Sequence, residues 1–209
     1  MSNLLFDFDG TIADSLSVIV AITNQLAPEF GYRPTPLAEV DALKGLTPRQ
    51  LIRYSGIPVL KIPALLRRLR QELRQQSIQI PPCSGMPEVI QQLRQDGHFL
   101  AIVTSNTPEV VWAFLATYGL EHCFASVDGG GTLFRKGRLI AQCLERHQLL
   151  STETAYVGDE VRDIAAARSA AVQAVSVTWG FNSRTALVAA NPDQLADDPK
   201  ALRAIADAI

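Results

Sequence analysis

Four short apolar runs set the strongest limit on how this chain can fold. They lie at residues 4–10, 99–103, 155–157 and 174–177, and the first ends in acidic residues and glycine. Continuous apolar runs of this length are typical of strands buried on both faces of a parallel sheet. Helical patterns of about ten residues separate the later runs. The sequence therefore predicts an α/β fold with a doubly wound, Rossmann-like parallel sheet, whose ligand site lies at the carboxyl ends of the strands.

One long segment, residues 15–81, interrupts this alternation and shows only helical periodicity. Gly31 ends its first apolar face, Thr47-Pro48 is typical of a helix start, and Pro81-Pro82 closes it. We expect an α/β core of residues 1–14 and 82–209, with residues 15–81 forming a small all-helical cap inserted after the first strand. Such a cap would act as a mobile lid over the carboxyl edge of the sheet.

Composition excludes several classes of protein. The 209 residues are 47% hydrophobic and carry a formal net charge of −2, so the chain has a core but no basic surface for nucleic acid. The longest apolar stretch, residues 16–22, is too short to span a membrane. The three cysteines are far apart and lack the spacing of a zinc site or a disulfide framework. We expect a cytoplasmic globular protein, monomeric or homodimeric, without nucleic-acid or membrane partners.

Two of the expected strands end in carboxylates. Asp7 and Asp9 follow the first strand, and alternation predicts that both point the same way, where their repulsion would be relieved by a divalent cation. Asp-Gly is also common turn chemistry, so a plain acidic turn is the alternative. A later strand ends at Gly158-Asp159, and Asp163 follows in the first turn of a helix, where negative charge is favourable.

Two further features are suited to binding phosphate. Thr104, Ser105 and Asn106 follow the second expected strand, where hydroxyls and backbone N–H groups could hold phosphate oxygens or, alternatively, cap the next helix. Lys136 is a candidate ammonium for the same oxygens, although most lysines are solvated surface residues.

Taken in order, these motifs resemble those of the haloacid dehalogenase superfamily of hydrolases. Its four motifs correspond to residues 7–11, residues 104–105, Lys136 and residues 158–163. The resemblance covers essentially the whole chain, including the helical insert. Residues 177–182, followed by Pro192-Asp193, also resemble the phosphoglycolate-phosphatase branch.

The resemblance implies an enzyme, a Mg²⁺-dependent phosphatase acting on a small phosphorylated metabolite similar to 2-phosphoglycolate. Asp7 would accept the phosphoryl group as an aspartyl phosphate, and Asp9 would protonate the leaving alcohol and later deprotonate water. Thr104 and Lys136 would bind the phosphoryl oxygens. The resemblance also implies that Thr11, Ser105 and Asn106 bind the substrate. For Mg²⁺ it implies Asp7, the Asp9 carbonyl and Asp159 as ligands. Asp163 would bind Mg²⁺ either directly or through another ligand.

Alternatives within and outside this family stay open. Asp9 and Asp159 together favour a phosphatase over a dehalogenase, and the lack of histidine in residues 15–31 counts against a phosphomutase. A pyrophosphatase, or a non-catalytic phosphate-binding or signalling module, would share much of the pattern. In relatives with a helical cap, a loop of the cap reads the substrate, so Lys44 and Arg49 are candidate contacts for an anionic substrate. A plain helix start explains these two residues equally well.

Overall fold

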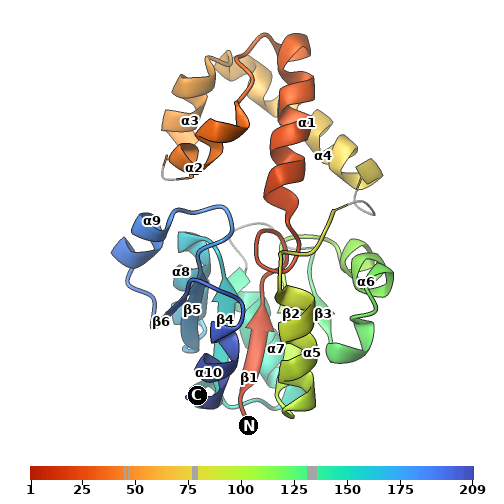
Figure 1. Ribbon diagram of the computed structural model, residues 1–209, viewed down its shortest axis with the longest axis vertical. Coiled ribbons are helices and arrows are strands. Elements are labelled where there is room, and N and C mark those ends of the chain that lie inside the picture. The colour runs from red at the N-terminus through yellow and green to blue at the C-terminus, as the bar shows by residue number, and fades with distance from the viewer. Residues whose placement is uncertain (45, 47, 77–79, 131–135) are drawn as a thin grey trace.

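The computed structural model describes residues 1–44, 46, 48–76, 80–130 and 136–209 (Figure 1). In these residues six strands, all parallel, form one sheet in the order β3-β2-β1-β4-β5-β6. The predicted α/β fold with a doubly wound parallel sheet is confirmed. The strands are β1 (Asn3–Phe6), β2 (Phe99–Val103), β3 (Val127–Asp128), β4 (Thr154–Gly158), β5 (Gln173–Val177) and β6 (Gln194–Ala196).

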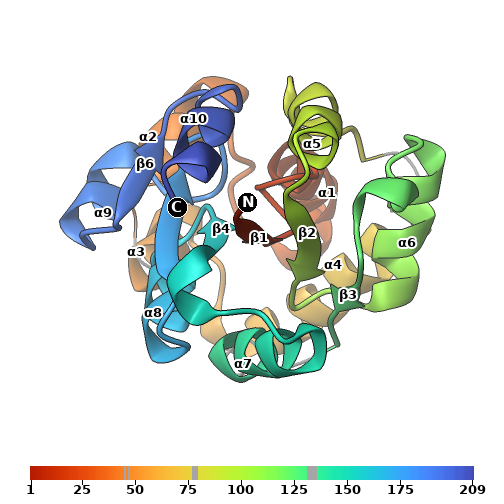
Figure 2. The same ribbon diagram turned by 90° about the horizontal axis from the view of Figure 1, so that it is seen from below.

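Helices cover both faces of the sheet (Figure 2). One face packs against α5 (Met86–Gln95), α6 (Pro108–Thr117) and α10 (Ala201–Asp207). The opposite face packs against a second set of helices. These are α7 (Lys136–His147), α8 (Val161–Ser169) and α9 (Arg184–Ala189), and short 3-10 turns lie at η4 (Glu121–Cys123) and η5 (Ser151–Glu153).

Alternation along β1 decides which helices its side chains meet. Leu4 and Phe6 are buried with α5 and α6, whereas Leu5 is buried on the face of α7 and α8. Asp7 follows the strand with the same parity as Leu5, and its backbone N–H still pairs with Val157 of β4. The carboxylate of Asp7 is therefore directed to the side from which α7 and α8 begin.

The edge strands are the part of the sheet that the sequence did not predict. β3 spans two residues and β6 three, and each pairs on one side only. Such short segments carry no detectable apolar run, because an edge strand is not buried on every side. The three internal strands after β1 fall on the predicted runs.

The described part of residues 15–81 is helical and contributes no strand to the sheet. Its elements are α1 (Ser15–Phe30), η1 (Leu37–Glu39), α2 (Val40–Leu43), α3 (Pro48–Ser55), η2 (Val59–Lys61) and α4 (Ile62–Gln76). Asp14 caps the start of α1, and Gly31 ends it in the left-handed conformation with φ 72°, as predicted. Thr47, the predicted cap of the next helix, lies outside the described residues.

This helical segment has a small apolar cluster of its own. Ile22, Leu26 and Phe30 of α1 are buried against Leu65 and Leu69 of α4. Figure 1 shows the segment standing above the carboxyl ends of the strands. No helix in the described residues is both long and apolar enough to cross a membrane.

Two chain crossings join the helical segment to the sheet, and they lie side by side. The backbone N–H of Asp14 donates to Pro81 at 2.8 Å, and that of Cys83 donates to Ile12 at 2.8 Å. These bonds pin both crossings together at one place. The division into a core and a mobile cap stays a prediction.

Ile22→Ala tests whether the helical segment unfolds separately. Ile22 is fully buried in the cluster of α1 and α4, so its truncation should cost about 2–5 kcal/mol of local stability. We expect amide hydrogen exchange to accelerate in α1 and α4 while β1 and β4 keep their protection. Ile90→Ala in α5 is the matched control and should instead weaken the sheet. Equal acceleration throughout the chain in Ile22→Ala would show that the helices and the sheet unfold as one unit.

Candidate functional site

The strand order brings the ends of β1 and β4 together. These two strands are neighbours at the point where the order of the sheet reverses, which is where ligands bind in open α/β sheets. Asp7 follows β1 and Asp159 follows β4. The two carboxylates predicted from distant parts of the sequence therefore lie at the same edge.

Three carboxylates cluster at this edge. Asp7, Asp159 and Asp163 each offer an oxygen, and these oxygens all lie within 4.8 Å of one another. The residues are 3%, 0% and 2% exposed, so water cannot screen their charges. Burial, and then the negative charge of Asp163, raises the pKa of Asp7. Burial, and then the charges of Asp7 and Asp163, raises the pKa of Asp159 well above its usual range.

Lys136 supplies a positive charge inside the cluster. Its Nζ lies 2.8 Å from Oδ2 of Asp7 and 2.6 Å from Oδ1 of Asp163. Burial alone would lower the pKa of Lys136, but the two carboxylates raise it above its ordinary value. Lys136 is the first residue of α7. Because the Asp7 side chain points to the face of the sheet that α7 covers, its carboxylate reaches Lys136. One ammonium among three carboxylates leaves an excess of negative charge.

The carboxylate of Asp159 is held from both sides. Thr11 Oγ1 donates to Oδ1 at 2.8 Å, and the backbone N–H of Phe181 donates to Oδ2 at 2.7 Å. A Cβ at Gly10 or at Gly180 would stand 2.4 or 2.2 Å from Oδ2. Gly10 also has φ 80°, a conformation that side chains disfavour. These contacts leave Asp159 a single orientation.

Asp163 is held by the start of α8. It forms a capping box with Glu160, whose backbone N–H donates to Oδ2 of Asp163 at 3.0 Å, while Oδ1 accepts from Lys136. A Cβ at Gly158 would lie 2.5 Å from the same carboxylate. The acidic residue in the first turn of a helix thus has a local structural role as well as a place in the cluster.

The donor set fits a hard divalent cation. Carboxylate oxygens are the ligands that Mg²⁺ prefers, and such a cation would offset the charge that Lys136 leaves unbalanced. The buried position of the cluster also suits a small ion. We therefore find that the residues fit a divalent metal.

Asp9 lies beside the end of β2 and is not one of the three clustered carboxylates. Oδ2 of Asp9 accepts from Nδ2 of Asn106 at 3.2 Å. Burial raises the pKa of Asp9, and the bond from Asn106 lowers it. The structure thus brings together two residues that the sequence predicted for catalysis and substrate binding.

Thr104 is fully buried in the turn that follows β2. Its Oγ1 accepts from the backbone N–H of Asn106 at 3.1 Å, and its own N–H donates to Asp128. Ser105 is partly buried between them. The N-cap of α6 is Thr107, so the alternative in which Thr104 or Ser105 caps that helix is wrong.

Comparisons with known proteins place the chain in a family. A model of the haloacid dehalogenase-like hydrolases matches residues 4–177. The chain belongs to this family. A protein from Synechococcus elongatus called phosphoglycolate phosphatase is 38% identical over 204 residues, covering 97% of this chain and 95% of its own length. A protein of the same name from Vibrio cholerae is 31% identical and covers 93% and 92%.

A solved structure agrees on the fold. A haloacid dehalogenase-like hydrolase from Streptococcus pneumoniae superposes with a TM-score of 0.80 at 23% identity, over 98% of each chain. The resemblance drawn from the sequence motifs is confirmed, and this family member is an enzyme, a phosphatase of the haloacid dehalogenase type.

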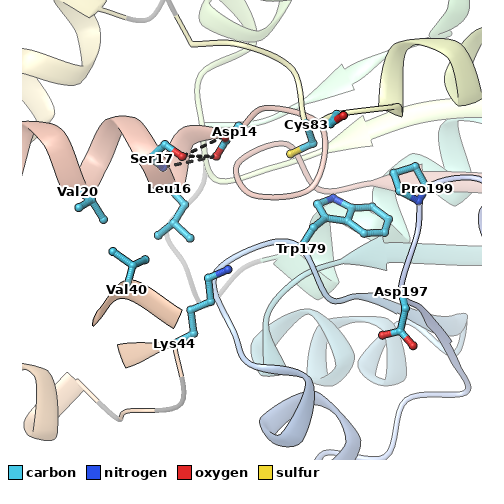
Figure 3. A pocket seen from close by; sticks show the side chains of 11 residues that line it. Asp14, Leu16, Ser17, Val20, Val40, Lys44, Cys83, Trp179, Asp197 and Pro199 are labelled. Atoms are coloured by element: carbon cyan, nitrogen blue, oxygen red, sulfur yellow. Dashed lines mark hydrogen bonds between the residues drawn. The ribbon is translucent and has the colours of Figure 1, made fainter. Parts of the chain in front are cut away.

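The structure describes the side chain of one of the two residues, Lys44 and Arg49, that the sequence predicts to contact the substrate. Lys44 ends α2, and its carbonyl accepts from the N–H of Ser183 at 3.3 Å. Lys44 also lines a cavity of about 380 Å³ between the helical segment and the core, beside Asp14 and Trp179 (Figure 3). None of the clustered carboxylates lines this cavity. Arg49 lies in α3, and its side chain is outside the described part of the structure.

Sequence reasoning missed the residues that hold the cluster. Thr11, predicted to bind substrate, donates its hydroxyl to Asp159, and substrate binding by it stays a prediction. The N–H of Phe181 has no side-chain signature at all. Gly180 was the available signal, since a glycine beside a buried carboxylate indicates close backbone approach.

Removing Lys136 tests how strongly the carboxylates repel one another. We expect Lys136→Met to lower the free energy of unfolding in cation-free buffer by about 3–5 kcal/mol, because buried carboxylates lose their partner. Mg²⁺ should restore part of this loss, since binding to the folded state stabilises it. Urea unfolding with and without Mg²⁺ measures both effects. Lys200→Met, at an exposed position, should change neither. A Lys136→Met variant as stable as Lys200→Met would contradict the electrostatic account.

Proposed function

We propose that this phosphatase hydrolyses a small phosphomonoester, 2-phosphoglycolate or a close analogue, through an aspartyl phosphate on Asp7. The supporting observation is that Asp7 lies 2.8 Å from Lys136 within a buried carboxylate cluster. Relatives at 38% and 31% identity carry the name phosphoglycolate phosphatase, which favours that substrate.

Asp7 is the nucleophile in this proposal. Its oxygen attacks phosphorus while the bond to the leaving alcohol breaks, and water then hydrolyses the acyl phosphate, so one hard step becomes two easier ones. Mg²⁺, held by Asp7, the Asp9 carbonyl, Asp159 and Asp163, would neutralise charge on the phosphoryl oxygens. Lys136 contributes positive charge to the same oxygens.

Asp9 moves the protons. In the first step it donates a proton to the oxygen of the leaving alcohol, and in the second it takes one from the attacking water, so the carboxyl returns to its starting state. A carboxyl must hold a proton at neutral pH to begin this cycle, and burial raises the pKa of Asp9 in the required direction. The amide of Asn106 orients it.

The remaining phosphoryl contacts come from the turn after β2. We assign the Thr104 hydroxyl, Ser105 and Asn106 to the phosphoryl oxygens. The Thr11 hydroxyl donates to Asp159, and a substrate contact by Thr11 stays a prediction from the sequence. Positioning of this kind supplies much of the rate of phosphoryl transfer, because the reacting groups must be in line. In the same proposal Lys44 and Arg49 of the cap meet the anionic tail of the substrate.

Replacing the nucleophile tests the mechanism. We expect Asp7→Asn to lower kcat on 2-phosphoglycolate and on p-nitrophenyl phosphate by about a thousandfold or more, because an amide cannot form the acyl phosphate. Asp96→Asn is the matched control at an exposed position and should retain full rate. Circular dichroism should show both variants folded. Activity of Asp7→Asn within tenfold of the original enzyme would sink the mechanism.

Lys44 tests whether the cap reads the substrate. We expect Lys44→Ala to reduce kcat/KM on 2-phosphoglycolate about tenfold to a hundredfold, the value of a hydrogen bond to a charged group. Hydrolysis of p-nitrophenyl phosphate, which has no carboxylate, should stay nearly normal. Lys200→Ala should change neither rate. If the whole substrate profile of Lys44→Ala matches this control, Lys44 only ends its helix and specificity lies elsewhere.

A further inference from the structure

A short segment after β5, residues 179–183, contacts the carboxylate cluster without contributing a side chain to it. The backbone N–H of Phe181 donates to Oδ2 of Asp159, and that of Asn182 donates to the Asp159 carbonyl at 3.3 Å. Asn182 Oδ1 accepts from the N–H of Val161, at the start of α8. One segment thus fixes Asp159 and the helix that carries Asp163.

The first residue of this segment reaches Asp159 by a second route. Nε1 of Trp179 donates to the carbonyl oxygen of Thr11 at 3.1 Å, and the hydroxyl of Thr11 donates to Oδ1 of Asp159 at 2.8 Å. Thr11 follows the left-handed Gly10, so its peptide lies in a turn and not in a regular strand. The indole N–H therefore anchors the peptide from which the Thr11 hydroxyl projects.

Trp179 also lies at a surface between the helical segment and the core. Its ring lines the 380 Å³ cavity between the helical segment and the core (Figure 3), and none of the clustered carboxylates lines that cavity. At the other end of the segment the N–H of Ser183 donates to the Lys44 carbonyl. The segment therefore contacts the helical part of the chain at Ser183 and the cluster at Phe181, and Trp179 lies at its start.

We propose that Trp179 is a positioning residue for the divalent-cation site: its indole N–H fixes Thr11, and Thr11 aims the carboxylate of Asp159 at the cation. The inference rests on the proposed function, in which Asp7, Asp159 and Asp163 bind Mg²⁺. Partners that orient a ligating carboxylate from outside strengthen metal binding, because the site loses less freedom on loading. Thr11 donates a hydrogen bond to Asp159 directly, whereas Trp179 acts on Asp159 only through its hydrogen bond to Thr11.

Mg²⁺ affinity, measured by isothermal titration calorimetry without substrate, tests this role. Thr11→Val removes the hydroxyl and should weaken binding about tenfold to a hundredfold. Trp179→Phe keeps an aromatic ring but removes the N–H, and should weaken binding about threefold to tenfold, since it acts through Thr11. Trp112→Phe, a partly buried tryptophan of α6 in the opposite half of the sheet, is the matched control and should bind Mg²⁺ normally.

The double variant separates positioning from a general loss of packing. If Trp179 acts through the Thr11 hydroxyl, adding Trp179→Phe to Thr11→Val should weaken Mg²⁺ binding no further, so the two effects are not additive. Thermal unfolding without Mg²⁺ shows whether each variant is folded at the titration temperature.

The outcomes are distinguishable from failure of the proposed function. If the original enzyme binds no divalent cation, the proposed metal site fails and the inference falls with it. If the original enzyme binds Mg²⁺ but Trp179→Phe binds it as tightly, or if the two effects add in full, then Trp179 does not act through Thr11 and only the inference is overturned.

Discussion

The repulsion among Asp7, Asp159 and Asp163 is the constraint on which the site depends. Three buried carboxylates with oxygens within 4.8 Å of one another cannot all be ionised without compensating positive charge. Lys136 supplies part of it, and a divalent cation of the kind that we propose supplies the rest. In our proposal the same negative charge attracts the divalent cation, and the cation together with Lys136 attracts the anionic phosphoryl group.

The fold meets this cost by leaving the carboxylates no alternative positions. Pairing of β1 with β4 brings Asp7 and Asp159 to one edge, and the capping box of α8 holds Asp163. Gly10 and Gly180 let the backbone approach Asp159 more closely than any side chain would permit. Preorganisation of this kind means that little rearrangement is needed when charge develops in the reaction.

The sequence predicted the carboxylates of the site better than it predicted the groups that hold those carboxylates in place. Apolar runs ending in carboxylates identify Asp7 and Asp159, because strands buried on both faces carry a strong signal. The sequence also placed Asp163 in the first turn of a helix, but the capping box that it forms with Glu160 was not predicted, because Glu is not a usual N-cap residue. The N–H of Phe181 reaches Asp159 through tertiary structure alone and has no counterpart in residue type. Likewise β3 and β6 are short edge strands of two and three residues, too short to carry a detectable apolar run.

Chemical trapping of the phosphoryl-enzyme tests the role of Asp7 most directly. Borohydride reduces an acyl phosphate to an alcohol, so enzyme quenched during turnover should carry homoserine in place of Asp7, detectable by peptide mass spectrometry. We expect this conversion only when substrate and Mg²⁺ are both present, and not at Asp9, Asp159 or Asp163. Conversion at another carboxylate, or none at Asp7 while turnover proceeds, would contradict nucleophilic attack by Asp7.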